Sequence, residues 1–328
     1  LELGVKIFFE VEAEGAVGKG EADLVIAADG IHSKIRHDYA EVFKPHTDHR
    51  KNKFIWLGTH KAFDAFTFAF EETKHGWIWA HAYRFDANTS TFIVECSRDT
   101  WHGLGLDSDD IDSSLLKCEA IFAKYLDGHK LMCKVGHLRG SAWLHFPRIH
   151  CERWHHENIV LMGDSAHTAH FSIGSGTKLA FEDAIFLAAA LHSPDYPTVE
   201  DALEAYQEAR RLEVLKLQSA ARNSTEWFEN VPRYTHFEPL QFAYSLLTRS
   251  QRLSHENLRV RDKGFVEKVE RWFAPKQAIP PMFTPFKVRG MELANRVVVS
   301  PMAMYSAVDG DPGDFPAFLT FTAAIFGK

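Results

Sequence analysis

The stretch GDSAHTAHFSIGSGTKLAFEDA, residues 163–184, decides the fold of this 328-residue chain. The apolar run ENIVLM precedes it at residues 157–162, and residues 177–191 are rich in Ala and Leu, as a helix is. Strand, turn and helix in this order place Asp164 at the carboxyl end of a buried strand. Open α/β sheets bind their ligands at that end of their strands. We therefore predict a ligand site around Asp164, whose carboxylate can accept hydrogen bonds from hydroxyl groups.

The glycines of this stretch suit a flat ligand. Gly174 and Gly176 lack a Cβ, so a ligand can approach the backbone closely. A helix that begins near Thr177 directs free N–H groups at the same place, which stabilises an anionic group by about 0.3–1 kcal/mol. A tight turn before a core helix is the alternative for an isolated Gly-x-Gly. The preceding strand, His167 and the EDA run at residues 182–184 together favour the ligand site.

A second stretch, DLVIAADGIHSKIR at residues 23–36, has the same order of features. A short apolar run ends at Asp29 and Gly30, Ser33 is placed to cap a helix, and Arg36 lies within that helix. Alone, Asp29 is equally a turn residue and Arg36 a solvated one. An alternating run at residues 5–13 predicts a further strand upstream.

Together the two stretches resemble the group A flavoprotein monooxygenases, the family of para-hydroxybenzoate hydroxylase. Residues 28–36 match the pattern ADG-x-x-S-x-x-R, and residues 163–176 match GDAAH-x-x-x-P-x-x-G-x-G except at Ser165 and Phe171. Lys178 also departs from the family, in which Asn is common there. The resemblance covers the first 250 residues or so. It implies an FAD site made by these residues: Asp29, Gly30, Arg36, Gly163, Asp164, His167, Gly174, Ser175, Gly176 and Thr177.

The resemblance also implies the chemistry of an aromatic hydroxylase, and hence an enzyme. NAD(P)H reduces FAD, O₂ forms a C4a-hydroperoxyflavin, and an electron-rich ring attacks its distal oxygen. The protein mainly supplies position and a dry pocket. His170 lies in the loop expected to face the ring and is the candidate catalytic residue. The alternative is a loop histidine bonded to solvent or backbone. No Gly-x-Gly-x-x-Gly turn precedes Asp29, so we expect the ADP-binding part of the site to be missing from this chain.

The last part of the chain resembles a second flavoprotein family. Residues 274–281 (APKQAIPP) have the composition of a linker. FTPFKVRGMELANRVVVSPMAMYS at residues 283–306 resembles the start of an old yellow enzyme barrel, in which Pro301 and Met302 would line FMN. A hairpin followed by a buried strand is the alternative. Residues 315–328 do not continue the pattern, which suggests a truncated gene or a frameshift, and we expect no reductase activity.

A hydroxylase followed by such a module resembles the bifunctional anthraniloyl-CoA monooxygenase/reductases and the salicylyl-CoA 5-hydroxylases. That likeness implies an aromatic acyl-CoA thioester as substrate, salicylyl-CoA or 2-aminobenzoyl-CoA, and FMN in the second module. Two alternatives stay open. One is a hydroxylase of a free phenolic or indole substrate, and the other is a non-catalytic, truncated fragment that serves only for association.

The expected fold is therefore α/β, in the mixed α+β sense. It comprises a partial Rossmann-like FAD-binding domain, an inserted antiparallel β-sheet for the substrate, C-terminal helices and the start of a TIM barrel. Helices are expected at 33–39, 107–126, 177–191, 198–219 and 256–273. The expected segments are 1–45 (end of the first FAD-binding segment), 46–150 (substrate sheet), 151–273 (second FAD-binding segment and helices), 274–281 (linker) and 282–328 (truncated barrel start).

Bulk composition bears on other partners. The net charge of −7 argues against nucleic acid and against an anionic membrane. We find no apolar run as long as a membrane span and no signal peptide. The four cysteines are scattered, and the histidine-rich run 145–156 lacks partners at zinc-ligand spacing, so we expect no metal site. A reduced, cytoplasmic setting fits best, and a homo-oligomer is left open.

Overall fold

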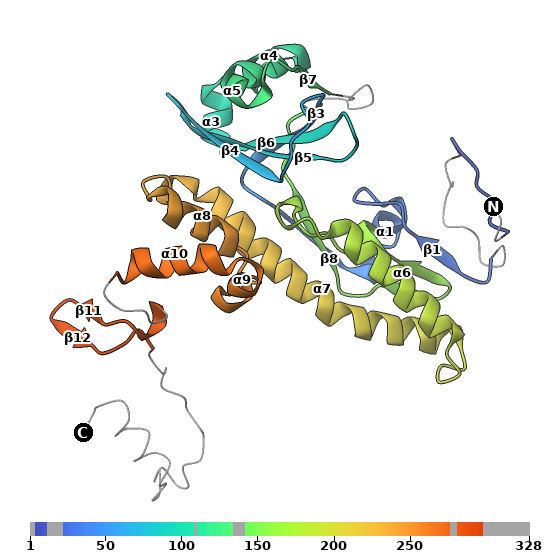
Figure 1. Cartoon of the computed structure of the whole chain (residues 1–328). Coiled ribbons are helices and arrows are strands. Elements are labelled where there is room, and N and C mark those ends of the chain that lie inside the picture. The colour runs from blue at the N-terminus through green and yellow to red at the C-terminus, as the bar shows by residue number, and fades with distance from the viewer. Residues whose placement is uncertain (1–3, 12–21, 108–109, 134–141, 276–280, 298–328) are drawn as a thin grey trace, which may run out of the picture. The chain divides into compact units, whose positions relative to one another are not determined.

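The computed structural model describes residues 4–11, 22–107, 110–133, 142–275 and 281–297. The chain divides into two compact units, Leu1–Leu253 and Ser254–Lys328 (Figure 1). Helices, parallel strands and antiparallel strands are mixed in the first unit, so the predicted mixed α/β class is confirmed. The expected start of a TIM barrel, with Pro301 and Met302, lies largely outside the described residues.

A three-stranded sheet joins the two stretches that the sequence singles out. Its order is β1 (Val25–Ala27), β10 (Ile159–Leu161) and β9 (His155–His156). β1 and β10 run parallel although they are far apart in the sequence. All three residues of β10 are buried, as expected for a short apolar strand covered on both faces. The strand predicted at residues 5–13 does not form within residues 4–11, where no neighbouring strand pairs with it.

Four helices either follow a strand of this sheet in the chain or share its apolar core. α1 (Lys34–Asp38) and α2 (Ala40–Phe43) come directly after β1, and the predicted cap is confirmed because Ser33 Oγ accepts a hydrogen bond from the Arg36 N–H. α6 (Gly176–His192) and α7 (Val199–Glu229) lie side by side (Figure 1). Thr198 and Asp201 form a capping box that starts α7 where the sequence predicts it.

A two-stranded antiparallel ribbon leads from this part of the unit into a second sheet. It pairs β2 (Pro45–His49) with β8 (Pro147–Cys151). The second sheet has the order β4 (Thr67–Thr73), β5 (Gly76–Arg84), β6 (Ser90–Cys96), β3 (Lys53–Thr59) and β7 (Leu131–Met132). Its paired strands are all antiparallel, which confirms that an antiparallel sheet is inserted in this fold.

The two faces of the second sheet have different coverings. One face packs against α3 (Arg98–Gly103), α4 (Ile111–Ile121) and α5 (Ala123–Leu126) in an apolar core. The opposite face is aromatic, with Trp79 packed on Phe228 of α7. Phe242 of α8 (Pro239–Thr248) contributes to the same cluster. α7 therefore spans both sheets of the unit, as Figure 1 shows.

The second unit begins with two short helices, α9 (His255–Arg261) and α10 (Lys263–Phe273). The sequence predicts a single helix here, but Asp262 interrupts it and caps α10 by accepting a hydrogen bond from the Phe265 N–H. A hairpin of β11 (Phe286–Val288) and β12 (Met291–Leu293) follows.

Candidate functional site

The carboxyl ends of β1 and β10 bring the two sequence motifs together. The strands are in register, and the Met162 N–H donates to the Ala27 carbonyl at 3.0 Å just beyond them. Asp29 and Gly30 follow β1, and Asp164 follows β10 in the short 3₁₀ turn η1 (Gly163–Ser165). The two acidic turns therefore lie at the same edge of the sheet.

Ser165 connects the two turns directly. Its hydroxyl donates to Asp29 Oδ1 at 2.9 Å, and its oxygen accepts from the Gly30 N–H at 3.0 Å. Burial alone would raise the pKa of Asp29, but hydrogen bonds, led by those from Ser33 and Ser165, hold that pKa below its ordinary value. Asp29 is thus a carboxylate fixed in place. The sequence marked Ser165 only as a departure from the family pattern.

Arg36 is buried, and its guanidinium group donates hydrogen bonds to the backbone of the same two turns. One Nη1 atom donates to the Ser165 carbonyl at 2.8 Å and to the Asp164 carbonyl at 3.3 Å, and Nη2 donates to the Ile31 carbonyl. Backbone carbonyls thus accept all three of these hydrogen bonds. The guanidinium group therefore fixes the separation of the two turns.

Gly163 lies where the turn meets α6. Its φ is +61°, a conformation that favours glycine, and a Cβ there would lie 3.1 Å from Ala180 Cβ. Its N–H donates to Asp183 Oδ2 at 3.0 Å. The close packing of turn and helix therefore requires glycine here.

Asp183 is the centre of a buried network beneath the turn. Besides the Gly163 N–H, Oδ2 lies 2.8 Å from His167 Nε2, and Oδ1 accepts from Arg210 Nε at 2.9 Å. Burial opposes ionisation of Asp183, but these partners, His167 first, lower its pKa. His167 is itself buried against Trp154. The structure thus places His167 inside the domain, supporting the turn.

Asp164 differs from Asp183 in that none of the described residues pairs with its carboxylate. Its side chain lies at the open edge, and among the described residues no group donates to it. Partial desolvation raises the pKa of Asp164, with His167 and Arg36 opposing that rise. A carboxylate in this situation is suited to accept hydrogen bonds from a ligand's hydroxyl groups.

The start of α6 offers the matching donors. Gly174 ends the 3₁₀ turn η2 (Phe171–Ile173) with φ +60°, and Ser175 is the N-cap residue of the helix. The Ser175 hydroxyl does not cap α6, because it donates to the Ile173 carbonyl at 3.3 Å. The N–H groups at Gly176 and Thr177 therefore remain open to an anionic or carbonyl acceptor.

His170 is buried in the loop between Asp164 and α6. Its Nδ1 accepts from the Ser172 N–H at 3.2 Å, and its ring lies edge-on to Phe146. Burial is the largest cause that lowers the pKa of His170 to about 4, and it outweighs the opposing charge of Glu95. His170 is thus neutral near pH 7, with Nε2 carrying the proton.

Arg249, the residue that follows α8, holds this loop in place by hydrogen bonds. Nothing in the sequence indicated this role of Arg249. Its Nη2 donates to the Ser172 carbonyl at 2.7 Å and its Nε to Ser224 Oγ at 3.0 Å. The Ser172 and Ser224 hydroxyls are 2.9 Å apart. Burial lowers the pKa of Arg249 to about 10, which still leaves it charged. No local pattern marks this contact, since its partners are distant in the chain.

Residues 3–221 match the family model of the FAD binding domain. The chain belongs to this family. Its relatives include salicyloyl-CoA 5-hydroxylase of a Streptomyces species, 38% identical over 94% of this chain and 60% of that protein. Another is 3-hydroxy-4-methyl-anthranilyl-[aryl-carrier protein] 5-monooxygenase of Streptosporangium sibiricum, 37% identical over 75% of this chain and 64% of that protein. A third is protodeoxyviolaceinate monooxygenase of Chromobacterium violaceum, 34% identical over 76% of this chain and 66% of that protein.

The chain spans 60–66% of the length of these three relatives. Among solved structures, PqsL of Pseudomonas aeruginosa in complex with 2-aminobenzoylacetate is similar at 22% identity and a TM-score of 0.47, over 64% of this chain and 57% of that one. Tetrameric 2-methyl-3-hydroxypyridine-5-carboxylic acid oxygenase is similar at 17% identity and a TM-score of 0.48, over 70% of this chain and 59% of that one.

The residues at the sheet edge fit the flavin that defines this family. Asp164, which no group among the described residues pairs with, could accept hydrogen bonds from the hydroxyl groups of a ribityl chain, and the uncapped start of α6 could donate to the ring's carbonyl edge. Gly176 has nothing within 4 Å of an added Cβ, so a flat ring can approach. Asp29, Gly30 and Arg36 hold the edge together. Pro301 and Met302, expected to bind a second flavin, lie outside the described residues.

Two further observations concern partners. The described residues contain no group of three or more His, Cys, Asp or Glu side chains that could hold a metal ion. None of the described helices combines the length and apolar character that a membrane crossing needs.

The low pKa of His170 predicts a specific pH dependence in this FAD-binding domain. The folded state binds the His170 proton less tightly than the unfolded state, whose ordinary value is 6.5. The neutral ring therefore stabilises the fold above pH 6.5, and this contribution is lost as the pH falls towards 4, by about 2–3 kcal/mol at pH 4.5.

His170→Asn keeps an acceptor for the Ser172 N–H but does not titrate. Urea unfolding at pH 7 and 4.5 should show a smaller acid loss in the variant. An equal loss in both proteins would remove His170 as the cause.

Proposed function

We propose that the natural full-length protein hydroxylates an aromatic acyl-CoA thioester, salicylyl-CoA or 2-aminobenzoyl-CoA, with FAD, NAD(P)H and O₂. One oxygen atom of O₂ enters a ring C–H bond to give C–OH, and the other leaves as water. NAD(P)H supplies the two electrons that balance the reaction and becomes NAD(P)⁺. FAD contributes the redox and oxygen chemistry, and the protein contributes binding, orientation and exclusion of water.

The likeness that carries the thioester proposal extends along nearly the whole chain. The match to salicyloyl-CoA 5-hydroxylase covers 94% of the chain, so it reaches into the unit Ser254–Lys328. The other two relatives match over about three quarters of the chain. A shared C-terminal part supports a substrate of the same kind. It also supports the proposal that residues 282–328 begin a second, FMN-dependent module.

The surroundings of the loop before α6 support an aromatic substrate. The Phe171 ring contacts Phe54, at a centroid distance of 4.9 Å, and Trp56, at 6.0 Å. Trp56 is half exposed on the aromatic face of the second sheet, whereas Phe54 is buried. A flat apolar ring can therefore stack beside Phe171 without displacing buried side chains. The backbone of the same loop continues into Gly174 at the flavin edge, so the substrate ring and the cofactor would be neighbours.

His170 is proposed to contact the substrate or the flavin edge as a neutral hydrogen-bond donor. Its Nδ1 is occupied by the Ser172 N–H, which leaves Nε2–H for a ligand. A ring activated by its own amino or hydroxyl group needs no strong base, so a neutral histidine suffices. The four cysteines form no disulfide, which agrees with the proposed cytoplasmic setting. Assembly into a homo-oligomer stays a prediction.

The function is tested by following substrate, NAD(P)H and O₂ together in the natural full-length protein. We expect salicylyl-CoA or 2-aminobenzoyl-CoA to gain one oxygen atom per NAD(P)H consumed, as seen by mass spectrometry with ¹⁸O₂. Free salicylate and free 2-aminobenzoate serve as matched controls and should not be hydroxylated efficiently. Equal or faster turnover of the free acids would favour the phenol-hydroxylase alternative. If the FAD-loaded protein hydroxylates none of these compounds, the proposed function is contradicted.

A further inference from the structure

A groove lies between the β2–β8 ribbon and α7, and Asp164 is not among the residues that line it. Its volume is about 470 Å³. Most of the residues that line it are polar or charged, among them His46, Asp48, Arg148, His150, Gln218 and Arg222. The residues come from both strands of the ribbon and from one face of α7, so the groove belongs to the framework of the unit.

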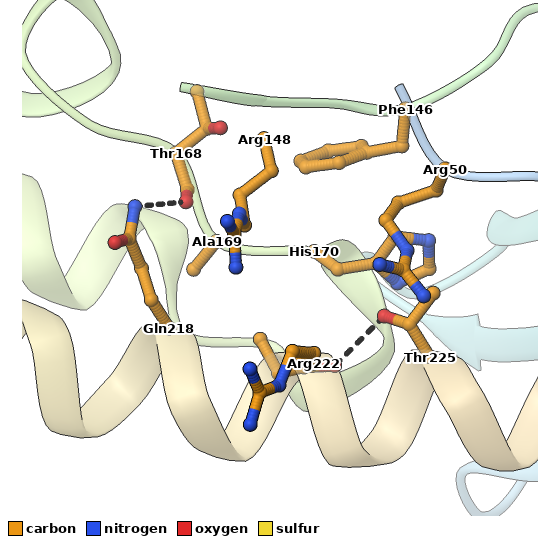
Figure 2. A pocket seen from close by; sticks show the side chains of 10 residues that line it. Arg50, Phe146, Arg148, Thr168, Ala169, His170, Gln218, Arg222 and Thr225 are labelled. Carbon is orange, nitrogen blue, oxygen red and sulfur yellow. Dashed lines mark hydrogen bonds between the residues drawn. The ribbon is translucent and has the colours of Figure 1, made fainter. Parts of the chain in front are cut away.

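A narrow space lies beside this groove, next to the loop that precedes α6. On the same scale its volume is about 10 Å³, room for about one water molecule. Arg148, Gln218 and Arg222 line both the groove and the narrow space, so these three side chains separate two adjacent spaces. Figure 2 shows His170 and Phe146 lining the narrow space, with Arg148 extending from β8 towards α7. A chain of single bonds is thin enough to replace the water there, once the partly exposed arginine side chains move aside.

Two arginines at this junction are only weakly paired. Arg148 Nε is 3.9 Å from Asp48 Oδ2, and Arg222 Nε is 3.7 Å from Glu226 Oε1, with all four side chains well exposed. Arg50 nearby is different, because it forms a bidentate pair with the buried Glu229 at 2.7 and 3.1 Å. The charge of Arg50 is therefore neutralised, while those of Arg148 and Arg222 are available to a ligand.

The charged residues that line the groove favour an anion, because they are two arginines and one aspartate. His150 Nδ1 is buried and has no hydrogen-bond partner among the described residues. Burial first, and then the positive charges of Arg211, His46 and Arg148, lower the pKa of His150. Asp48 is acidic, but it is shared between Arg50 at 3.5 Å and Arg148 at 3.9 Å. An anion entering the groove therefore meets an excess of positive charge.

We propose that this groove binds the pyrophosphate of the CoA thioester, with Arg148 and Arg222 as its binding residues. The proposal rests on the function proposed above and adds the site that holds the carrier. Guanidinium groups are positively charged and present forked donors that suit phosphate oxygens. The thin pantetheine arm would then run through the narrow space past His170 towards Phe171, where the substrate ring is proposed to stack.

The test uses the natural full-length protein with Arg148→Gln, Arg222→Gln and the double variant. Arg233→Gln is the matched control, since Arg233 is exposed and lines neither space. Titration calorimetry with CoA alone should show a roughly tenfold weaker Kd in the double variant and an unchanged Kd in the control. With salicylyl-CoA the KM should rise by a similar factor at constant kcat. With the phosphate-free salicylyl-pantetheine thioester, parent and variant should have the same KM.

The readouts separate this proposal from the proposed function. An unchanged Kd for CoA in the double variant would overturn the groove site even if thioesters are hydroxylated. A higher KM for NAD(P)H in place of the thioester would also overturn it, because the groove would then hold the dinucleotide. Arginine-dependent CoA binding without hydroxylation of any thioester would support the groove and contradict the function.

Discussion

Replacing Arg210 with Met should lower the free energy of unfolding by about 3–5 kcal/mol. The side chain of Arg210 is 2% exposed and that of its partner Asp183 is 0% exposed. Removal of the guanidinium leaves a buried carboxylate without its compensating charge. Asp183 then either stays ionised at a high cost or takes up a proton and loses an acceptor for its remaining donors. Urea unfolding followed by fluorescence of the eight tryptophans would measure the change.

The control is Lys216→Met, which removes an exposed partner of Glu213 on the same helix. We expect it to change stability by no more than about 0.5 kcal/mol, since exposed ion pairs on helices contribute little. A loss below about 1 kcal/mol for Arg210→Met would show that Asp183 does not depend on this charge. The account of the turn beneath Gly163 would then have to change.

The sequence predicted the outline of the site because its signals are local. The acidic turns at Asp29 and Asp164 each follow a short apolar run, and parallel strands bring such turns to the same edge. Ser33 as a cap, Gly174 before the helix and the start of α7 at Thr198 are local as well. Hydrogen bonds over three or four residues are set by the chain itself.

The parts that the sequence could not predict depend on tertiary packing. Arg210 and Arg249 are far along the chain from the motif residues that they contact, Asp183 and Ser172. The residues next to these arginines in the sequence form no pattern that would predict the contacts. The end of α7 was also predicted too early, at residue 219. Its last turns contain Ser224 and Thr225, which are weak helix formers. They remain helical because Trp227 and Phe228 are buried against the second sheet.

The assignment of His167 shows a different limit. The motif places it among residues that hold the flavin, but its ring is buried against Trp154 and bonded to Asp183. Sequence spacing gives the order of residues in a loop, not the side of the loop on which each side chain lies. Ser165 shows the reverse, because a departure from the pattern becomes the link between Asp29 and Gly30.

The central claim is that the edge formed by Asp29, Asp164 and the start of α6 is the ring side of an FAD site. Asp164→Ala in the natural full-length protein tests it most directly, since this carboxylate is exposed and lacks a partner among the described residues. Fluorescence titration should show a Kd for FAD about 10–100-fold higher than in the parent protein, because charge-assisted hydrogen bonds to ribityl hydroxyls are lost. Asp195→Ala, at the turn between α6 and α7, should leave that Kd unchanged. Equal FAD affinity in the parent and the Asp164→Ala variant would contradict the claim.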